Sequence, residues 1–187
     1  MIHPVIYLDI DGVLNGHKFN HLAESNIIEP YRIKHLNWIL LQTDARIVLS
    51  SAWRYMIHGG AMTLTGFEYL LRTHGLIAGR LIGATCLDET QWNTRGRQIA
   101  SFHNRYVSPL AKAVVIDDGD DEDTYGLRSC GIPWVRTNGK IGLTRDDAWH
   151  AIMFLSRPSD PSCSSPSSPH APCRNASTSR ASHPGSR

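Results

Sequence analysis

Short apolar runs alternate with segments of helical periodicity along the first 155 residues. Each run is rich in β-branched or aromatic residues and is bounded by polar or turn residues, which is typical of strands buried in a parallel sheet. The predicted strands are Val5 to Ile10, Ile47 to Leu49, a weaker Leu81 to Ala84, Ala113 to Ile116, and Pro133 to Arg136.

Apolar residues three and four positions apart predict helices between these strands. Pro30 stands where the first can begin, because proline suits the first turn of a helix. The other predicted helices are one from Leu64 that ends near Gly75, one from Arg97 to Tyr106, one running toward Cys130, and one from Asp146 to Leu155. Strands that alternate with helices predict an α/β fold, an open, mainly parallel sheet with helices on both faces.

The composition changes after Leu155. Residues 156–187 contain 11 Ser and 6 Pro and lack large apolar side chains, so they cannot bury enough surface to offset the entropy lost on ordering. We therefore predict one domain over residues 1–155 and a disordered Ser/Pro/Arg-rich tail over residues 156–187.

Charge and hydropathy exclude several classes of protein. The formal net charge is +2, but the tail holds four Arg against one acid, which leaves residues 1–155 with a net charge of −1. A broadly cationic nucleic-acid-binding surface is therefore not expected. No apolar run approaches the roughly 18 residues of a membrane span, and the amino terminus lacks a basic leader, so we expect a cytoplasmic protein. No segment predicts a stable protein partner.

Two carboxylates follow the first predicted strand. Asp9 and Asp11 are two positions apart, which places them on one face if the strand continues through Ile10. Ligands bind at the carboxyl edge of an open α/β sheet. Gly12 lets the chain turn sharply there. An ordinary strand end with turn-forming Asp residues is the alternative interpretation.

A second acidic cluster follows the strand that ends at Ile116. Six of the seven residues from Asp117 to Asp123 are acidic, and a hard divalent cation with oxygen ligands is the simplest counter-charge. We assign metal binding and catalysis to Asp117 and Asp118, and helix capping to Asp120 through Asp123. Ser50 and Ser51 end a third strand, where hydroxyls and backbone N–H groups can cradle a phosphate.

Together these segments resemble the haloacid dehalogenase-like (HAD) phosphohydrolase superfamily. Its first, second and fourth motifs are matched by Asp9-Ile-Asp11-Gly-Val, Ile47-Val-Leu-Ser50 and Val114-Val-Ile-Asp117-Asp118. For the third, a single cation, we choose Arg95, with Arg97 and Lys112 as alternatives. In detail the motifs look most like the HAD domain associated with bacterial RNA-repair (Swiss Army Knife) proteins.

The resemblance implies a Mg²⁺-dependent phosphatase. Asp9 would be the nucleophile that forms an aspartyl-phosphate, and Asp11 the general acid and then the general base. Asp9, the backbone carbonyl of Asp11, and Asp117 would hold Mg²⁺, with Asp118 orienting the metal shell. Ser50 and Arg95 would hold the phosphate oxygens, and Ser51 is the alternative if the motif is shifted by one residue.

Members of the superfamily often carry a cap domain, and here no segment is long enough for a full one. A capless or minimally capped site suits a large phosphorylated substrate, such as an RNA or DNA end. Six residues are candidates for lining the approach: His17, Lys18, His21, Arg54, Tyr55 and Trp92. A phosphotransferase or mutase, and a non-catalytic phosphate-binding module, are the alternative functions.

Overall fold

Five parallel strands form one sheet in the order β3-β2-β1-β4-β5. The computed structural model describes residues 2–15, 28–85, 94–119 and 124–156. The strands are β1 (Val5–Leu8), β2 (Arg46–Leu49), β3 (Leu81–Ala84), β4 (Ala113–Asp117) and β5 (Trp134–Arg136). The predicted α/β class with a parallel sheet is confirmed.

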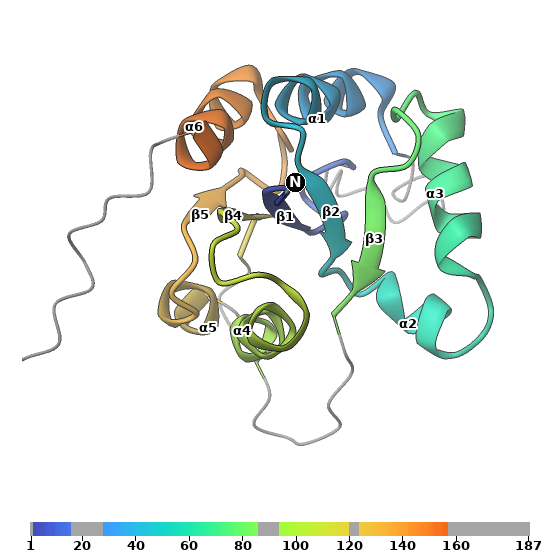
Figure 1. Cartoon of the computed structure of the whole chain (residues 1–187). Coiled ribbons are helices and arrows are strands. Elements are labelled where there is room, and N and C mark those ends of the chain that lie inside the picture. The colour runs from blue at the N-terminus through green and yellow to red at the C-terminus, as the bar shows by residue number, and fades with distance from the viewer. Residues whose placement is uncertain (1, 16–27, 86–93, 120–123, 157–187) are drawn as a thin grey trace, which may run out of the picture.

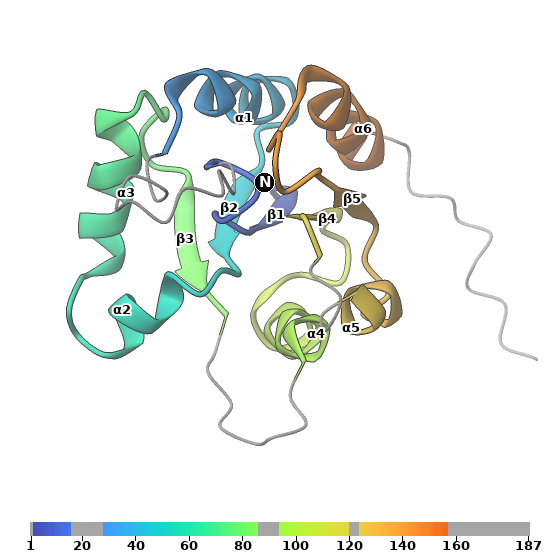
Figure 2. The ribbon, with the colours of Figure 1, turned by 180° about the vertical axis from the view of Figure 1, so that it is seen from behind.

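Helices cover both faces of this sheet (Figures 1 and 2). On one side lie α1 (Pro30–Thr43), α3 (Leu64–Thr73) and α6 (Arg145–Ser156). On the other lie α4 (Arg95–Tyr106) and α5 (Thr124–Ser129). A short helix, α2 (Arg54–His58), follows β2; its five residues are too few to show a periodicity in the sequence. None of the described helices has the length and hydropathy that a bilayer crossing requires.

Alternation along the strands divides the interior into two cores. Ile6 and Leu8 of β1 belong to the core beneath α1, α3 and α6, whereas Tyr7 belongs to the core beneath α4 and α5. β4 repeats this pattern, with Ile116 in the first core and Val115 in the second. Because β1 and β4 pair in register, residues that leave the two strands toward α4 emerge side by side.

The first predicted strand is shorter than expected. β1 ends at Leu8 rather than Ile10, and the carbonyl of Ile10 accepts hydrogen bonds from the backbone of Val13 and Leu14 in the following turn. Gly12 makes this turn with a φ of 71°. The prediction that Asp9 and Asp11 extend from one continuous strand face is therefore wrong, because Asp11 already lies in the turn.

The segment between β2 and α4 belongs to the core domain in its described part. Phe67 and Leu71 of α3 are fully buried in the first core, the one beneath α1, α3 and α6, and β3 pairs with β2. Residues 54–85 therefore form no separate cap. The predicted capping residues Asp120–Asp123 and the tail beyond Ser156 lie outside the described residues, as do His17, Lys18, His21 and Trp92.

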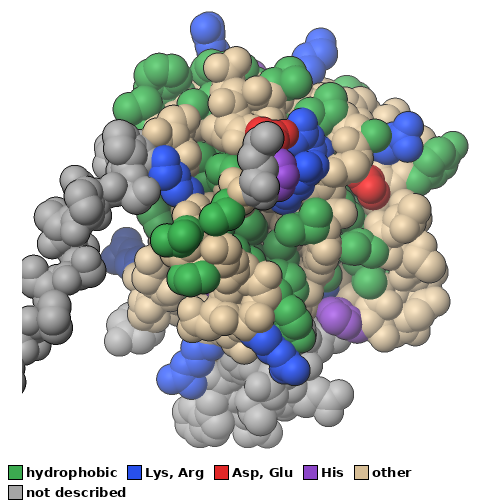
Figure 3. Space-filling model, in the orientation of Figure 1, with side chains coloured by type: hydrophobic (Ala, Val, Ile, Leu, Met, Phe, Trp, Pro, Cys, Tyr) green, Lys and Arg blue, Asp and Glu red, His purple; other side chains and the backbone are tan. Residues whose placement is uncertain are grey.

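Basic side chains are spread over the face of the molecule seen in Figure 3 and do not gather into one patch. Hydrophobic side chains lie between them. The described residues visible on this face therefore form no broad cationic surface for a nucleic-acid duplex.

Candidate active site

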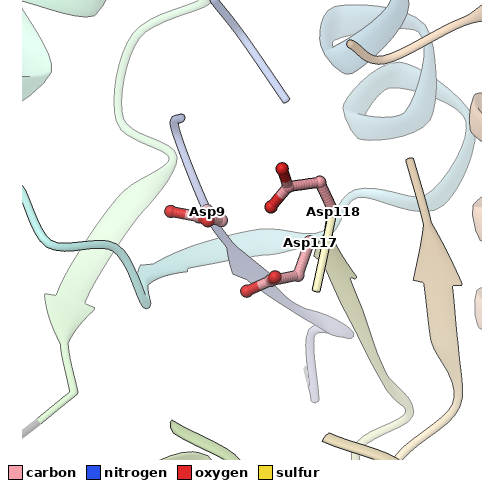
Figure 4. Close-up of side chains that lie close together, drawn as sticks. All are labelled: Asp9, Asp117 and Asp118. Atoms are coloured by element: carbon pink, nitrogen blue, oxygen red, sulfur yellow. The ribbon is translucent and has the colours of Figure 1, made fainter. Parts of the chain in front are cut away.

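Three carboxylates converge at the carboxyl ends of β1 and β4. One oxygen from each of Asp9, Asp117 and Asp118 lies within 4.8 Å of the other two. Figure 4 shows the side chains extending in the same general direction from the ends of the two strands. Asp9 is 4% exposed and Asp117 is 1% exposed, so much of this negative charge is shielded from water.

Arg95 bridges two of these acids. Its Nη1 is 2.6 Å from Asp9 Oδ2 and 2.7 Å from Asp117 Oδ2. Arg95 is the first residue of α4, which the sheet's second core holds beside β1 and β4. Of the candidate cations, the structure thus brings Arg95 to the acids. Arg97 is exposed, and Lys112 precedes the amino end of β4, about 13 Å or more from the acids at the opposite end.

Burial dominates the electrostatics of this cluster. It raises the pKa of Asp9 above its usual range, although the charge of Arg95 and hydrogen bonds from Ser51 and the Ile10 N–H oppose the rise. Burial, followed by the negative charge of Asp9, raises the pKa of Asp117 from 3.8 to about 7. Arg95 therefore does not fully compensate the desolvation of these acids.

The cluster fits a divalent cation on these grounds. Its donors are hard carboxylate oxygens, which Mg²⁺ and Ca²⁺ prefer, and they lie close enough to share one ion. The raised pKa values of Asp9 and Asp117 indicate an excess of buried negative charge that a cation would neutralise.

The two serines after β2 differ in their contacts. Ser51 hydrogen-bonds to Asp9 through its side chain and accepts a weak bond of 3.4 Å from the Trp53 backbone N–H. Ser50 is 1% exposed, and its Oγ has no hydrogen-bond partner among the described residues. A buried hydroxyl without a partner is costly, so Ser50 is the serine with hydrogen-bonding capacity left for a ligand.

Asp11 is held by residues outside the three-acid group. Its carboxylate accepts hydrogen bonds from Trp53 Nε1, at 3.2 and 3.1 Å to its two oxygens, and from Asn15 Nδ2 at 2.7 Å. Its side chain is not one of the three carboxylates whose oxygens lie within 4.8 Å of one another. Nothing in the sequence pattern indicated Trp53, which is 42 residues away along the chain.

The last strand holds the backbone that carries the acids. Trp134 Nε1 donates to the carbonyl of Asp117 at 3.0 Å. Arg136 Nε donates to the carbonyl of Asp118 at 2.9 Å. Thr137 reaches across to the first motif, where its hydroxyl donates to the Gly12 carbonyl at 2.9 Å. One segment thus fixes both acidic loops, a role that only the sheet order reveals.

Of the two described approach residues, one is misassigned. Arg54 is buried, and it donates from Nη1 to the Ser51 carbonyl and from Nη2 to Gln98 Oε1, both at 2.7 Å. It therefore ties the loop after β2 to α4 and does not line a surface. Tyr55 is exposed, in agreement with a position at the surface.

Glycines allow α4 and α5 to approach closely at Arg95. A Cβ on Gly96 would lie 1.8 Å from the backbone carbonyl oxygen of Gly126. Because no side-chain rotation relieves such a clash, we expect Gly96→Ala to separate the two helices, lower the free energy of unfolding by about 1–3 kcal/mol, and weaken any activity that depends on Arg95. Urea unfolding and an assay of that activity measure the two effects.

Gly66→Ala in α3 is the matched control. It makes the same change within a helix, but its Cβ would meet only side-chain atoms, the nearest at 3.1 Å. We expect the free energy of unfolding to change by less than about 1 kcal/mol, because the gain in helix propensity offsets the tight contact. Equal losses in both variants would contradict the role assigned to the α4–α5 contact.

A parallel α/β sheet with buried acids, a cation and serine hydroxyls at its carboxyl edge is the arrangement expected of a HAD-type phosphohydrolase. The family described as "HAD domain in Swiss Army Knife RNA repair proteins" matches residues 5–148. The chain therefore belongs to this family, as its motifs predicted. A search of curated proteins finds none that matches the chain.

Proposed function

We propose that the protein is a Mg²⁺-dependent phosphomonoester hydrolase that acts through an aspartyl-phosphate on Asp9. The observation that carries this proposal is the convergence of Asp9, Asp117 and Asp118 within 4.8 Å beside the guanidinium of Arg95. A nucleophilic carboxylate next to metal-binding carboxylates and a cation is the set of groups that phosphoryl transfer requires.

The chain's own residues divide the chemistry between two steps. In the first, an oxygen of Asp9 attacks phosphorus, the bond to the leaving oxygen breaks, and Asp11 gives that oxygen its proton. In the second, Asp11 takes a proton from water, whose oxygen attacks phosphorus and releases the Asp9 carboxylate. Arg95 and the Ser50 hydroxyl bind the phosphate oxygens.

The carboxylates of Asp9 and Asp117 and the backbone carbonyl of Asp11 would hold Mg²⁺, while Asp118 orients its shell. Bound there, the ion supplies charge that offsets the repulsion between the phosphate and the attacking carboxylate. Gly12 permits this arrangement, since a Cβ at that position would lie 2.2 Å from Asp118 Oδ2.

Phosphorylated ends of RNA or DNA are the substrates we propose. Two observations support this choice: the matched family is described from RNA repair proteins, and the described residues provide no separate cap domain. A substrate much larger than a sugar phosphate excludes water by its own bulk when it covers such a site.

A substrate panel tests both parts of the proposal. Purified protein with Mg²⁺ is incubated with RNA and DNA oligonucleotides bearing 3′- or 5′-phosphates, and with sugar phosphates and mononucleotides, and released phosphate is measured. We expect release from polymer ends to be fastest. A preference for small compounds contradicts the end-processing substrate, and transfer of phosphate to an added alcohol in place of water contradicts the hydrolase.

A further inference from the structure

We propose that Trp53 is a positioning residue for proton transfer by Asp11, an inference that rests on the proposed phosphatase function. The indole Nε1–H donates to both carboxylate oxygens of Asp11. An indole N–H is a donor only, so it holds the Asp11 carboxyl group through the acceptor oxygens of that group and orients it. Trp53 would affect the reaction only indirectly, through its hydrogen bonds to Asp11.

The indole ring is placed by the core and not by Asp11. Trp53 lies between β2 and α2, and its ring packs on Phe67 with 5.7 Å between centroids. Phe67 is fully buried in the core beneath α1, α3 and α6. The donor is therefore already in position before a substrate binds, which is the condition for orienting a catalytic group without a further entropic cost.

A second preplaced donor completes the arrangement. Asn15 is buried, its Oδ1 accepts from the Gly12 N–H at 3.0 Å, and its Nδ2 donates to Asp11 Oδ1 at 2.7 Å. The amide orientation is fixed, because the backbone N–H can only donate and the carboxylate can only accept. Among the described residues, Oδ1 thus receives two donors and Oδ2 only the shared indole bond, so Oδ2 is the oxygen with more hydrogen-bonding capacity left for the leaving oxygen of a substrate.

These contacts predict how the effect of Trp53 depends on the leaving group. When the Asp11 proton moves to a basic leaving oxygen, negative charge appears on the Asp11 carboxylate, and the indole N–H stabilises it. A weakly basic leaving group departs without needing that proton. Loss of the indole N–H should therefore slow poor leaving groups far more than good ones.

The test compares phenyl phosphate with 4-nitrophenyl phosphate in Trp53→Phe, which keeps an aromatic ring on Phe67. The ratio kcat/KM depends only on the steps up to and including the first irreversible one, which is the departure of the leaving group. It therefore reports proton donation even if water attack limits kcat. We expect kcat/KM to fall about 10–100-fold for phenyl phosphate and less than about 3-fold for 4-nitrophenyl phosphate.

Trp149→Phe is the matched control, since this tryptophan is exposed on α6, and both ratios should stay at the wild-type value. If Trp53→Phe does not fold, replacing the indole with benzothiophene keeps the shape and removes only the N–H. Equal losses for the two substrates, or no loss, would overturn the role of Trp53. Absence of phosphate release by the wild-type protein would instead overturn the proposed function.

Discussion

Asp9→Asn is expected to lower phosphate release by about 10³-fold or more while the protein remains folded. The amide cannot form the aspartyl-phosphate. Its stability should equal or exceed that of the wild type above neutral pH, because burial raises the pKa of Asp9 and its charge raises the pKa of the neighbouring Asp117. Removing one buried charge relieves both costs, although it gives up an ion pair with Arg95.

Phosphate release from 4-nitrophenyl phosphate and thermal unfolding together measure this result. Asp146→Asn is the control, because it makes the same chemical change at an exposed position on α6 and should alter neither quantity. A titration with Mg²⁺ separates a nucleophile from a metal ligand. If excess Mg²⁺ restored the activity of Asp9→Asn, Asp9 would serve only to hold the ion. If Asp9→Asn turned over at the wild-type rate without excess Mg²⁺, Asp9 would have no role in the mechanism.

The features predicted well from sequence are those set by local pattern. Buried strands are recognised in a sequence as short apolar runs. When the strands are parallel, the residue after such a run lies at the carboxyl edge of the sheet. This reasoning placed Asp9, Ser50 and Asp117 at one edge, where the structure has them. The choice of Arg95 is consistent with its two ion pairs.

The features that could not be predicted depend on contacts between distant segments. The turn that removes Asp11 from the strand face is stabilised by the loops that follow β5, including a bond from the Leu143 N–H to the Val13 carbonyl. The partner of Asp11, Trp53, lies just before the five-residue helix α2, which is too short to give a periodic signal in the sequence. In the sequence Arg54 has the character of a surface cation, but in the structure it is buried and hydrogen-bonds to Gln98 of α4.

Stability without a metal should fall as pH rises from about 4 to about 7, and Mg²⁺ should reverse the fall. The pKa of Asp117 is about 7 in the folded protein, against 3.8 ordinarily, so the folded state binds more protons than the unfolded state between these values. Linkage then lowers the free energy of unfolding across this window, by at most a few kcal/mol. The cost is complete above about pH 7, where ionised Asp117 lies beside Asp9.

Mg²⁺ and protons compete for the same oxygens, so the ion should raise the unfolding temperature strongly at about pH 8 and weakly at about pH 5. Unfolding is followed at several pH values with Mg²⁺ or with a chelator at matched ionic strength. Titrating groups distant from the cluster cancel when wild type is compared with Asp117→Asn, which should lose a large part of the pH slope together with the Mg²⁺ response. Asp9 keeps a share of the slope, because burial raises its pKa too. An undiminished Mg²⁺ response in that variant would place the ion elsewhere and remove Asp117 from its binding site.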